Sequence, residues 1–262
     1  MNLRLTGGLL LAVAVALGYW AATPSTATAW VGCDGTWSNK FLGNGRSGTG
    51  LKGVYAEIEY INENLCTQGA TKVHSWSLSW VSLDGPQSSQ VPGIDIFQGG
   101  YAKCPDPTVG SCPWNNGVTY YWVYYAREQG ACGAAFNTGF IKIANASSGL
   151  HFFQVSKVGS QYNFYIDETL KYQRSLSDID TCWPGVSAVE YQDEMLNNGD
   201  QAGGTVSNHQ LFGEVQYQNA SGWHYENRTS GSACDANSYP TYWRCNWDYT
   251  GHNFYPWDGR AP

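Results

Sequence analysis

Hydrophobic and polar positions alternate along short segments of this chain, which is the period of a strand rather than of a helix. Turn-forming pairs such as Asn116-Gly117 and Ser148-Gly149 separate these segments. The best helix candidate, Ala188 to Leu196, is short, and nothing long enough for a βαβ crossover intervenes. We therefore predict an all-β fold, an antiparallel β-sandwich in a single domain. The expected strands are 53–61, 73–83, 93–98, 118–126, 140–144, 151–158, 162–166, 186–191 and 210–217.

The two ends of the chain depart from this pattern. Arg4, an apolar run over residues 9–17 and the sequence Ala27-Thr28-Ala29 form the pattern of a secretory signal peptide. The apolar run is shorter than the ~20 residues of a membrane span. The last forty residues are aromatic and polar, with little Leu, Ile or Val. We predict a signal peptide at 1–29, a β-sandwich domain at 30–222 and an aromatic-rich, disulfide-bonded C-terminal extension at 223–262, packed on the same domain.

An even number of cysteines in an exported chain indicates disulfide bonds. No C-x-x-C spacing occurs, so a structural zinc site is not expected. Spacing favours the local pairs Cys104–Cys112 and Cys234–Cys245, and elimination then leaves Cys33–Cys66 and Cys132–Cys182, although sequence cannot fix connectivity. The eight candidates are Cys33, Cys66, Cys104, Cys112, Cys132, Cys182, Cys234 and Cys245.

Composition narrows the classes of partner. Charged residues make up 13% of the chain, about half of the usual share of roughly 25%, which excludes a coiled coil or a long charged tail. Aromatic residues make up 15%, so disorder is not expected. The formal net charge is −7, with no basic stripe. We therefore expect no nucleic-acid partner and no attachment to an anionic membrane once the signal is cleaved. Together with the signal peptide, this leads us to expect a secreted protein, and we expect it to be a monomer.

Common catalytic motifs are absent from the sequence. There is no G-x-S-x-G, no H-E-x-x-H and no glycine-rich phosphate loop. The five histidines are scattered, and we expect each of them to be structural or exposed. The cysteines can all pair, so a catalytic thiol is not expected. Carboxylates and side-chain amides remain as the candidates, without a metal or a cofactor.

Two segments place such groups where they could act. Gln98 follows Ile94 and Ile96 on one face of a predicted strand, and the two glycines after it allow another chain to approach closely. Its amide offers both a donor and an acceptor. Glu190 lies among apolar and aromatic neighbours, where three carboxylates crowd into residues 190–194. Desolvation is expected to raise its pKa, which suits a general acid or base. A strand-end glutamine and a solvated acidic turn are the alternatives on pattern alone.

Six short motifs keep a recognisable order from about residue 76 to 220. They are Trp80 to Gly85 (WVSLDG), Gln98-Gly99-Gly100, Tyr120 to Tyr125 (YYWVYY), Cys182, Ala188 to Tyr191 (AVEY) and Phe212 to Val215 (FGEV). This order resembles that of the glutamic peptidases, or eqolisins, which are secreted proteases with a concanavalin-like β-sandwich. The chain departs from the family in having no cysteine between the Asp-Gly turn and the glutamine, and in having Tyr191 where the family often has Trp. Cys104 to Cys112 is interpreted as an insertion, and the C-terminal extension has no counterpart.

The resemblance implies a function and assigns residues to it. It makes Gln98 the catalytic glutamine and Glu190 the catalytic glutamate of a metal-independent endopeptidase, with no cofactor and a polypeptide as substrate. The substrate-binding residues that it implies are Trp80, Asp84, Tyr120, Trp122 and Tyr124.

Three other interpretations stay open at this point. Exposed aromatic and amide side chains would also suit a carbohydrate-binding, lectin-like module of the same architecture. A polysaccharide-degrading enzyme would need a second carboxylate ~5–10 Å from Glu190, with Glu57, Glu59 or Glu214 as candidates. A disulfide-stapled envelope protein would need no ligand at all.

Overall fold

The computed structural model describes ten stretches of the chain. Every described residue belongs to one compact unit, which lies within residues 31–262. The predicted signal peptide lies outside the described residues, as do all the cysteines except Cys66 and Cys245. Among the described residues, no helix has the length and apolar character needed to cross a membrane. The described stretches are 37–66, 76–85, 96–103, 119–126, 136–137, 141–175, 185–197, 199–227, 243–248 and 250–261.

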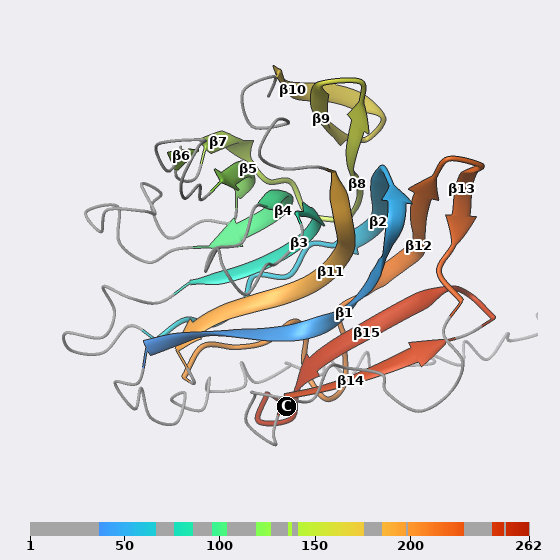
Figure 1. Cartoon of the computed structure of the whole chain (residues 1–262). Coiled ribbons are helices and arrows are strands. Elements are labelled where there is room, and N and C mark those ends of the chain that lie inside the picture. Colours follow the sequence, from blue (N-terminus) through green and yellow to red (C-terminus); the bar gives the residue numbers. More distant parts are fainter. Residues whose placement is uncertain are drawn as a thin grey trace, which may run out of the picture. The chain divides into compact units, whose positions relative to one another are not determined.

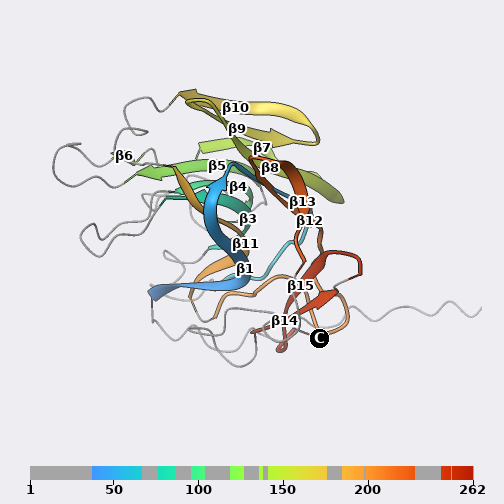
Figure 2. The same cartoon turned by 45° about the vertical axis from the view of Figure 1, so that its right-hand side comes forward.

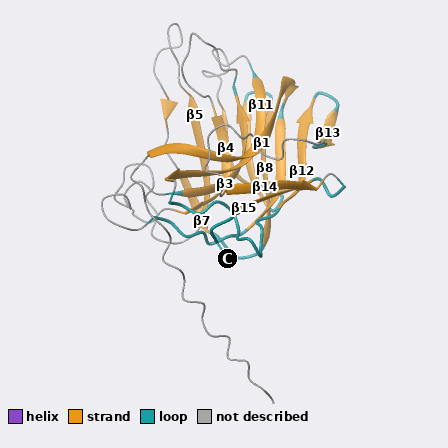
Figure 3. Cartoon of the chain, turned by 90° about the horizontal axis from the view of Figure 1, so that it is seen from below, coloured by secondary structure: helices purple, strands orange, loops and turns teal. Residues whose placement is uncertain are grey.

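All regular structure in these stretches is strand (Figure 3). The strands are β1 (Trp37–Leu51), β2 (Gly53–Glu59), β3 (Ser77–Asp84), β4 (Ile96–Lys103), β5 (Thr119–Ala126), β6 (Phe136–Asn137), β7 (Ile141–Asn145), β8 (Leu150–Val158), β9 (Gln161–Ile166), β10 (Thr169–Ser175), β11 (Val186–Asn197), β12 (Phe212–Asn219), β13 (Gly222–Tyr225), β14 (Trp243–Asp248) and β15 (Asn253–Asp258).

These strands form two antiparallel sheets. The first has the order β1-β11-β3-β4-β5-β6, with β7 also paired to β5. The second has the order β10-β9-β8-β2-β12-β15-β14, with β13 also paired to β12. Figures 1 and 2 show β1, β11, β3 and β4 side by side in one sheet and β2, β8 and β12 in the other. The predicted concanavalin-like sandwich is therefore confirmed.

The core forms because alternate residues of each strand face the opposite sheet. In β3 these residues are Val81 and Leu83, and in β11 they are Val189 and Tyr191. They pack against residues of the second sheet such as Phe164, which is fully buried. The intervening residues of β3 point the other way, yet all eight residues of that strand are buried. Strand β3 is thus covered on both faces, and the face that points away from the second sheet carries the candidate site.

Two expectations about local structure need correction. The helix candidate, Ala188 to Leu196, is part of strand β11, because β1 and β3 pair with it on both sides and satisfy its backbone. Gln98 lies near the start of β4 rather than at the end of a strand, because the ladder continues through Gly99 and Gly100 to Lys103.

The C-terminal segment contributes strands to the second sheet. β15 pairs with β12 through Phe254 and Phe212, and β14 pairs with β15 along its length. Cys66 and Cys245 are both disulfide-bonded rather than free thiols. The predicted pairings involve cysteines outside the described residues and stay predictions.

Candidate functional site

The sheet register brings the two predicted catalytic residues to one face. Glu190 of β11 lies opposite Ser82 of β3, and Ser82 lies opposite Gln98 of β4. Residues directly opposite one another project from the same face of a sheet. Strands are ~4.8 Å apart, so the Cα atoms of Glu190 and Gln98 are separated by about 10 Å. Two residues far apart in sequence therefore flank a single serine.

Glu190 is held by an amide and by a second carboxyl group. Gln192, two residues along on the same face, donates from Nε2 to Glu190 Oε2 at 2.7 Å. Asp84 of β3 also hydrogen-bonds Glu190, and Ser82 Oγ donates to Asp84 Oδ1 at 2.8 Å. Burial, and then the charge of Glu190, raise the pKa of Asp84 well above its ordinary value. Asp84 therefore keeps its proton to a higher pH than an ordinary aspartic acid, and it does so in direct contact with Glu190.

Glycines on β1 make room for these side chains. Gly45 lies opposite Glu190, and Gly43 lies opposite Gln192. A Cβ on Gly45 would lie 2.8 Å from Cγ of Glu190, and one on Gly43 would lie 2.5 Å from Cγ of Gln192. Any larger residue at Gly45 would displace Glu190.

Gln98 is fixed on its other side by a tyrosine and a second glutamate. Its side chain is 4% exposed, and its Nε2 donates to Tyr121 Oη at 2.5 Å. Burial raises the pKa of Glu194 to about 7, and contacts with Gln98 and Trp80 offset part of that rise. The Trp80 indole N–H approaches Glu194 without reaching the geometry of a full hydrogen bond. Glu194 is therefore protonated in mild acid, and it is hydrogen-bonded to the side-chain amide of Gln98.

The structure separates the residues that the resemblance linked to substrate. Trp80 and Asp84 lie on the same face as Gln98. Tyr120 packs into the core between the sheets, on the other face. Trp122 and Tyr124 pair through their backbones with Gly99 and Phe97, and their side chains lie outside the described part.

Sequence reasoning missed Tyr121, Glu194 and the roles of Ser82 and Gln192. The period of two along a strand puts Glu190, Gln192 and Glu194 on one face, so this signal was present in the sequence. The contact of Tyr121 with Gln98 depends on the register between β4 and β5, which no local pattern specifies.

The carboxylates proposed as partners of Glu190 are elsewhere. Glu57 and Glu59 lie on β2 and Glu214 lies on β12, in the second sheet. The carboxyl group that faces Glu190 is Asp84. No group of three or more acidic, histidine or cysteine residues in the described stretches is arranged to hold a metal ion.

Known proteins match this chain in structure but not in sequence. No protein-family model and no curated protein matches it. Scytalido-glutamic peptidase, solved with a peptide-based transition-state analog, superposes with a TM-score of 0.52 and 12% identity, covering 85% of this chain and 100% of that one. SCP-B, a member of the eqolisin family of peptidases solved with the tripeptide Ala-Ile-His, gives a TM-score of 0.50 and 11% identity over the same shares.

A glycoside hydrolase family 16 endo-glucanase from Bacteroides ovatus gives a TM-score of 0.37 at 14% identity, covering 63% of this chain and 70% of that one. A likeness this weak carries no weight for function. The predicted resemblance to the glutamic peptidases is confirmed at the level of the fold, which this chain shares with them over most of its length.

Proposed function

We propose that this protein is a glutamic-peptidase-like hydrolase that cleaves peptide bonds with Glu190 and Gln98. The observation that carries the proposal is the register of β11, β3 and β4, which sets Glu190, Ser82 and Gln98 in one line across a sheet face. The fold likeness to two glutamic peptidases supports it.

In this mechanism Glu190, ionised, removes a proton from a water molecule as that water attacks the peptide carbonyl. Gln98 accepts a hydrogen bond from the water through Oε1 and donates one from Nε2 to the oxyanion that forms. One such donor contributes on the order of 3–4 kcal/mol where water is excluded. Glu190 then gives the proton to the leaving amine.

Asp84 and Glu194 prepare the two reacting groups. Asp84, whose pKa is raised by burial, hydrogen-bonds Glu190 and keeps its carboxylate in place. Glu194 and Tyr121 hold the amide of Gln98. In acid, Glu194 becomes neutral and no longer competes as a charged acceptor for the Gln98 N–H group, which favours donation to the oxyanion.

The test is cleavage of an unfolded protein by the mature chain between pH 2 and pH 7. We expect cleavage in acid that declines at the lowest pH, where Glu190 is protonated. Gln98→Ala should lower turnover by roughly 100-fold or more, as loss of an oxyanion donor does, and Glu190→Gln should abolish it. Glu57→Gln, a partly exposed glutamate of the second sheet, is the matched control. Cleavage retained in Glu190→Gln would overturn the proposal.

A glycoside hydrolase is the alternative, and the geometry supports it less. Asp84 and Glu190 hydrogen-bond each other directly, whereas the acid and the base of a glycosidase stand ~5–10 Å apart. Hydrolysis of β-glucan or carrageenan oligosaccharides discriminates between the two. A glycosidase would lose activity in Asp84→Asn and Glu190→Gln but keep much of it in Gln98→Ala, whereas a peptidase needs Gln98.

The proposal includes export as a monomer with disulfide bonds, on the strength of residues 1–29 and the even cysteine count. Detection of the chain in the culture medium with Trp30 as its first residue tests this.

A further inference from the structure

Away from Glu190 and Gln98, three complementary side chains meet near the turn between β7 and β8. Ser147 Oγ lies 3.0 Å from His151 Nε2. His151 Nδ1 lies 2.7 Å from Asp167 Oδ2. Ser147 belongs to the turn, His151 lies in β8, and Asp167 follows β9, so three separate elements supply the group.

The chemistry of the acceptors determines where the protons are. An ionised carboxylate can only accept, so His151 Nδ1 carries the proton that is donated to Asp167. His151 Nε2 is then an acceptor for the Ser147 hydroxyl. Tyr120 Oη lies 3.0 Å from Ser147 Oγ and can donate to it. Phe152 N donates to Asp167 Oδ1 at 3.0 Å and fixes the carboxylate. Each hydrogen-bond donor in this group of side chains therefore has an acceptor.

Packing immobilises the histidine while leaving the serine open to solvent. The His151 ring meets Tyr120 and Tyr101 edge to face, at centroid distances of 5.5 and 6.3 Å. Its side chain is 16% exposed, and that of Asp167 is 47% exposed. Ser147 is exposed. The His151 side chain is thus held by its packing, with Nε2 within hydrogen-bond distance of the accessible Ser147 hydroxyl.

The turn that supplies Asp167 is the two-residue connection of a hairpin, because Ile166 of β9 pairs with Thr169 of β10. Asp167 and Glu168 both adopt a positive φ, 48° and 60°. A two-residue hairpin turn of type I′ requires this conformation at both positions. Here it places the Asp167 carboxylate against both His151 and the Phe152 amide.

We propose that Ser147 is an activated nucleophile, with His151 as its general base and Asp167 as the residue that positions His151. Such triads are recognised by geometry and by the role of each group, not by sequence order. The exposure of Ser147 suits small activated esters as acyl donors. The proposal does not depend on the peptidase function.

The reaction balances without any co-reactant other than water. Ser147 Oγ forms a bond to the acyl carbon, its proton passes to His151 Nε2, and the bond to the leaving alkoxide breaks as that alkoxide takes the proton. Water then attacks the acyl-serine with His151 again as base, which releases the acid and restores Ser147.

The test uses a fluorophosphonate probe on the purified chain, with intact mass and peptide mapping as readouts. Attack by Ser147 forms a P–O bond and expels fluoride with the serine proton. We expect one label, on Ser147, which is lost in Ser147→Ala and kept in Ser148→Ala, the neighbouring serine of the same turn. His151→Gln should slow labelling by roughly 100-fold, the lower range for loss of a general base.

Asp167→Asn tests the positioning role, because Asn tolerates a positive φ but presents the wrong hydrogen-bonding group to His151. We expect labelling at least about 10-fold slower with an unchanged Tm, which loss of a structural contact would not produce. If His151→Gln fails to fold, Asp167→Asn decides the matter. No label on Ser147, equal labelling of Ser148, or an unchanged rate in a folded His151→Gln or Asp167→Asn variant would overturn the proposal.

Discussion

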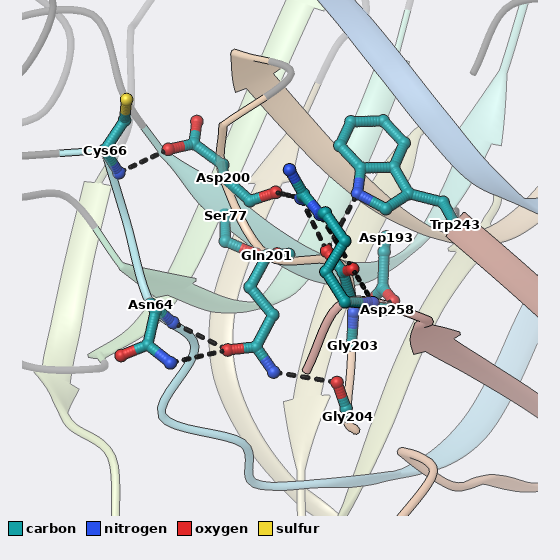
Figure 4. A network of polar contacts seen from close by, with 11 residues as sticks. Asn64, Cys66, Ser77, Asp193, Asp200, Gln201, Gly203, Gly204, Trp243 and Asp258 are labelled. Atoms are coloured by element: carbon teal, nitrogen blue, oxygen red, sulfur yellow. Dashed lines mark hydrogen bonds and ion pairs between the residues drawn. The ribbon is translucent and has the colours of Figure 1, made fainter. Parts of the chain in front are cut away.

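Two groups of buried acidic residues in this molecule have different partners. Near the C-terminus, Asp258 accepts hydrogen bonds from Trp243 Nε1 at 3.0 Å and from Arg260 Nη2 at 2.7 Å (Figure 4). Arg260 also donates to the backbone oxygen of Asp200 at 3.0 Å. On the face of the first sheet, Asp84 instead meets a serine hydroxyl and a second carboxyl group, Glu190.

The difference in partners implies a difference in role. A buried carboxylate paired with a guanidinium joins segments of the chain, and removal of one partner leaves the other group uncompensated. A buried carboxyl group beside another acid keeps an exchangeable proton, and such groups concentrate at functional sites. The C-terminal network therefore stabilises the fold, whereas Asp84 and Glu190 retain the capacity for chemistry.

The largest effect on stability should come from removing the carboxylate of Asp258. Asp258→Ala leaves Arg260 and the Trp243 indole with lost partners in the interior, and should lower the free energy of unfolding by about 3–5 kcal/mol. Asp84→Asn keeps a side chain of the same shape that can accept from Ser82 and donate to Glu190, and it should cost far less. Urea unfolding of both variants at pH 7 makes the measurement. Equal losses of unfolding free energy in the two variants would contradict the proposed difference in role between Asp258 and Asp84.

The second largest effect concerns how the free energy of unfolding depends on pH. Burial raises the pKa of Glu194 from 4.5 to about 7. The folded state therefore binds the proton more tightly than the unfolded state. This contribution to stability is fully present below about pH 4.5 and is lost as the pH rises through about 7. At about 1.4 kcal/mol for each pH unit, the loss amounts to about 3 kcal/mol.

Glu194→Gln tests this directly, because it removes the titrating group. At pH 8 the variant should be the more stable protein, and its free energy of unfolding should vary less between pH 4 and pH 8. Glu168→Gln, at an exposed turn position, should leave the wild-type dependence unchanged. A wild-type protein that gains stability from pH 4 to pH 8 would contradict the burial argument.

The sequence was informative where a period of two decides the outcome. Alternation predicted the sheets, and the order of motifs led to Gln98 and Glu190. It did not decide whether residues 188–196 form a helix or a strand, because both periods put Glu190 and Glu194 on one side. Pairing of β11 with β1 and β3 settled that choice.

Contacts that depend on register between distant strands could not be predicted. Asp84 meets Glu190 because β3 and β11 pair in one register, and a shift by one residue would separate them. Ser147, His151 and Asp167 form no motif, since a turn, a strand and a second turn supply them. The scattered histidines were expected to be structural or exposed, and nothing local distinguished His151.

The smallest effect should come from two serine hydroxyl groups of β3, each of which supports a buried carboxyl group of the first sheet. Ser82 Oγ donates to Asp84 Oδ1 at 2.8 Å, and Ser79 Oγ donates to Asp193 Oδ1 at 2.7 Å. Both serines are on β3, but they point to opposite faces. Loss of either hydrogen bond should lower the free energy of unfolding by about 1 kcal/mol.

Ser82→Ala and Ser79→Ala should differ in the pH profile of peptide cleavage. The Ser82 hydrogen bond lowers the pKa of Asp84, so Ser82→Ala should raise that pKa further and move the pH profile of peptide cleavage. Ser79→Ala should leave the profile in place, because Asp193 is also held by the backbone N–H of Gly203 at 2.9 Å and lies away from Glu190. Carbon-13 NMR titration of Asp84 measures its pKa, and the pH profile of cleavage measures the consequence. An equal movement of the profile in both variants would show that the serines alter the fold in general, and that the proton on Asp84 has no special link to catalysis.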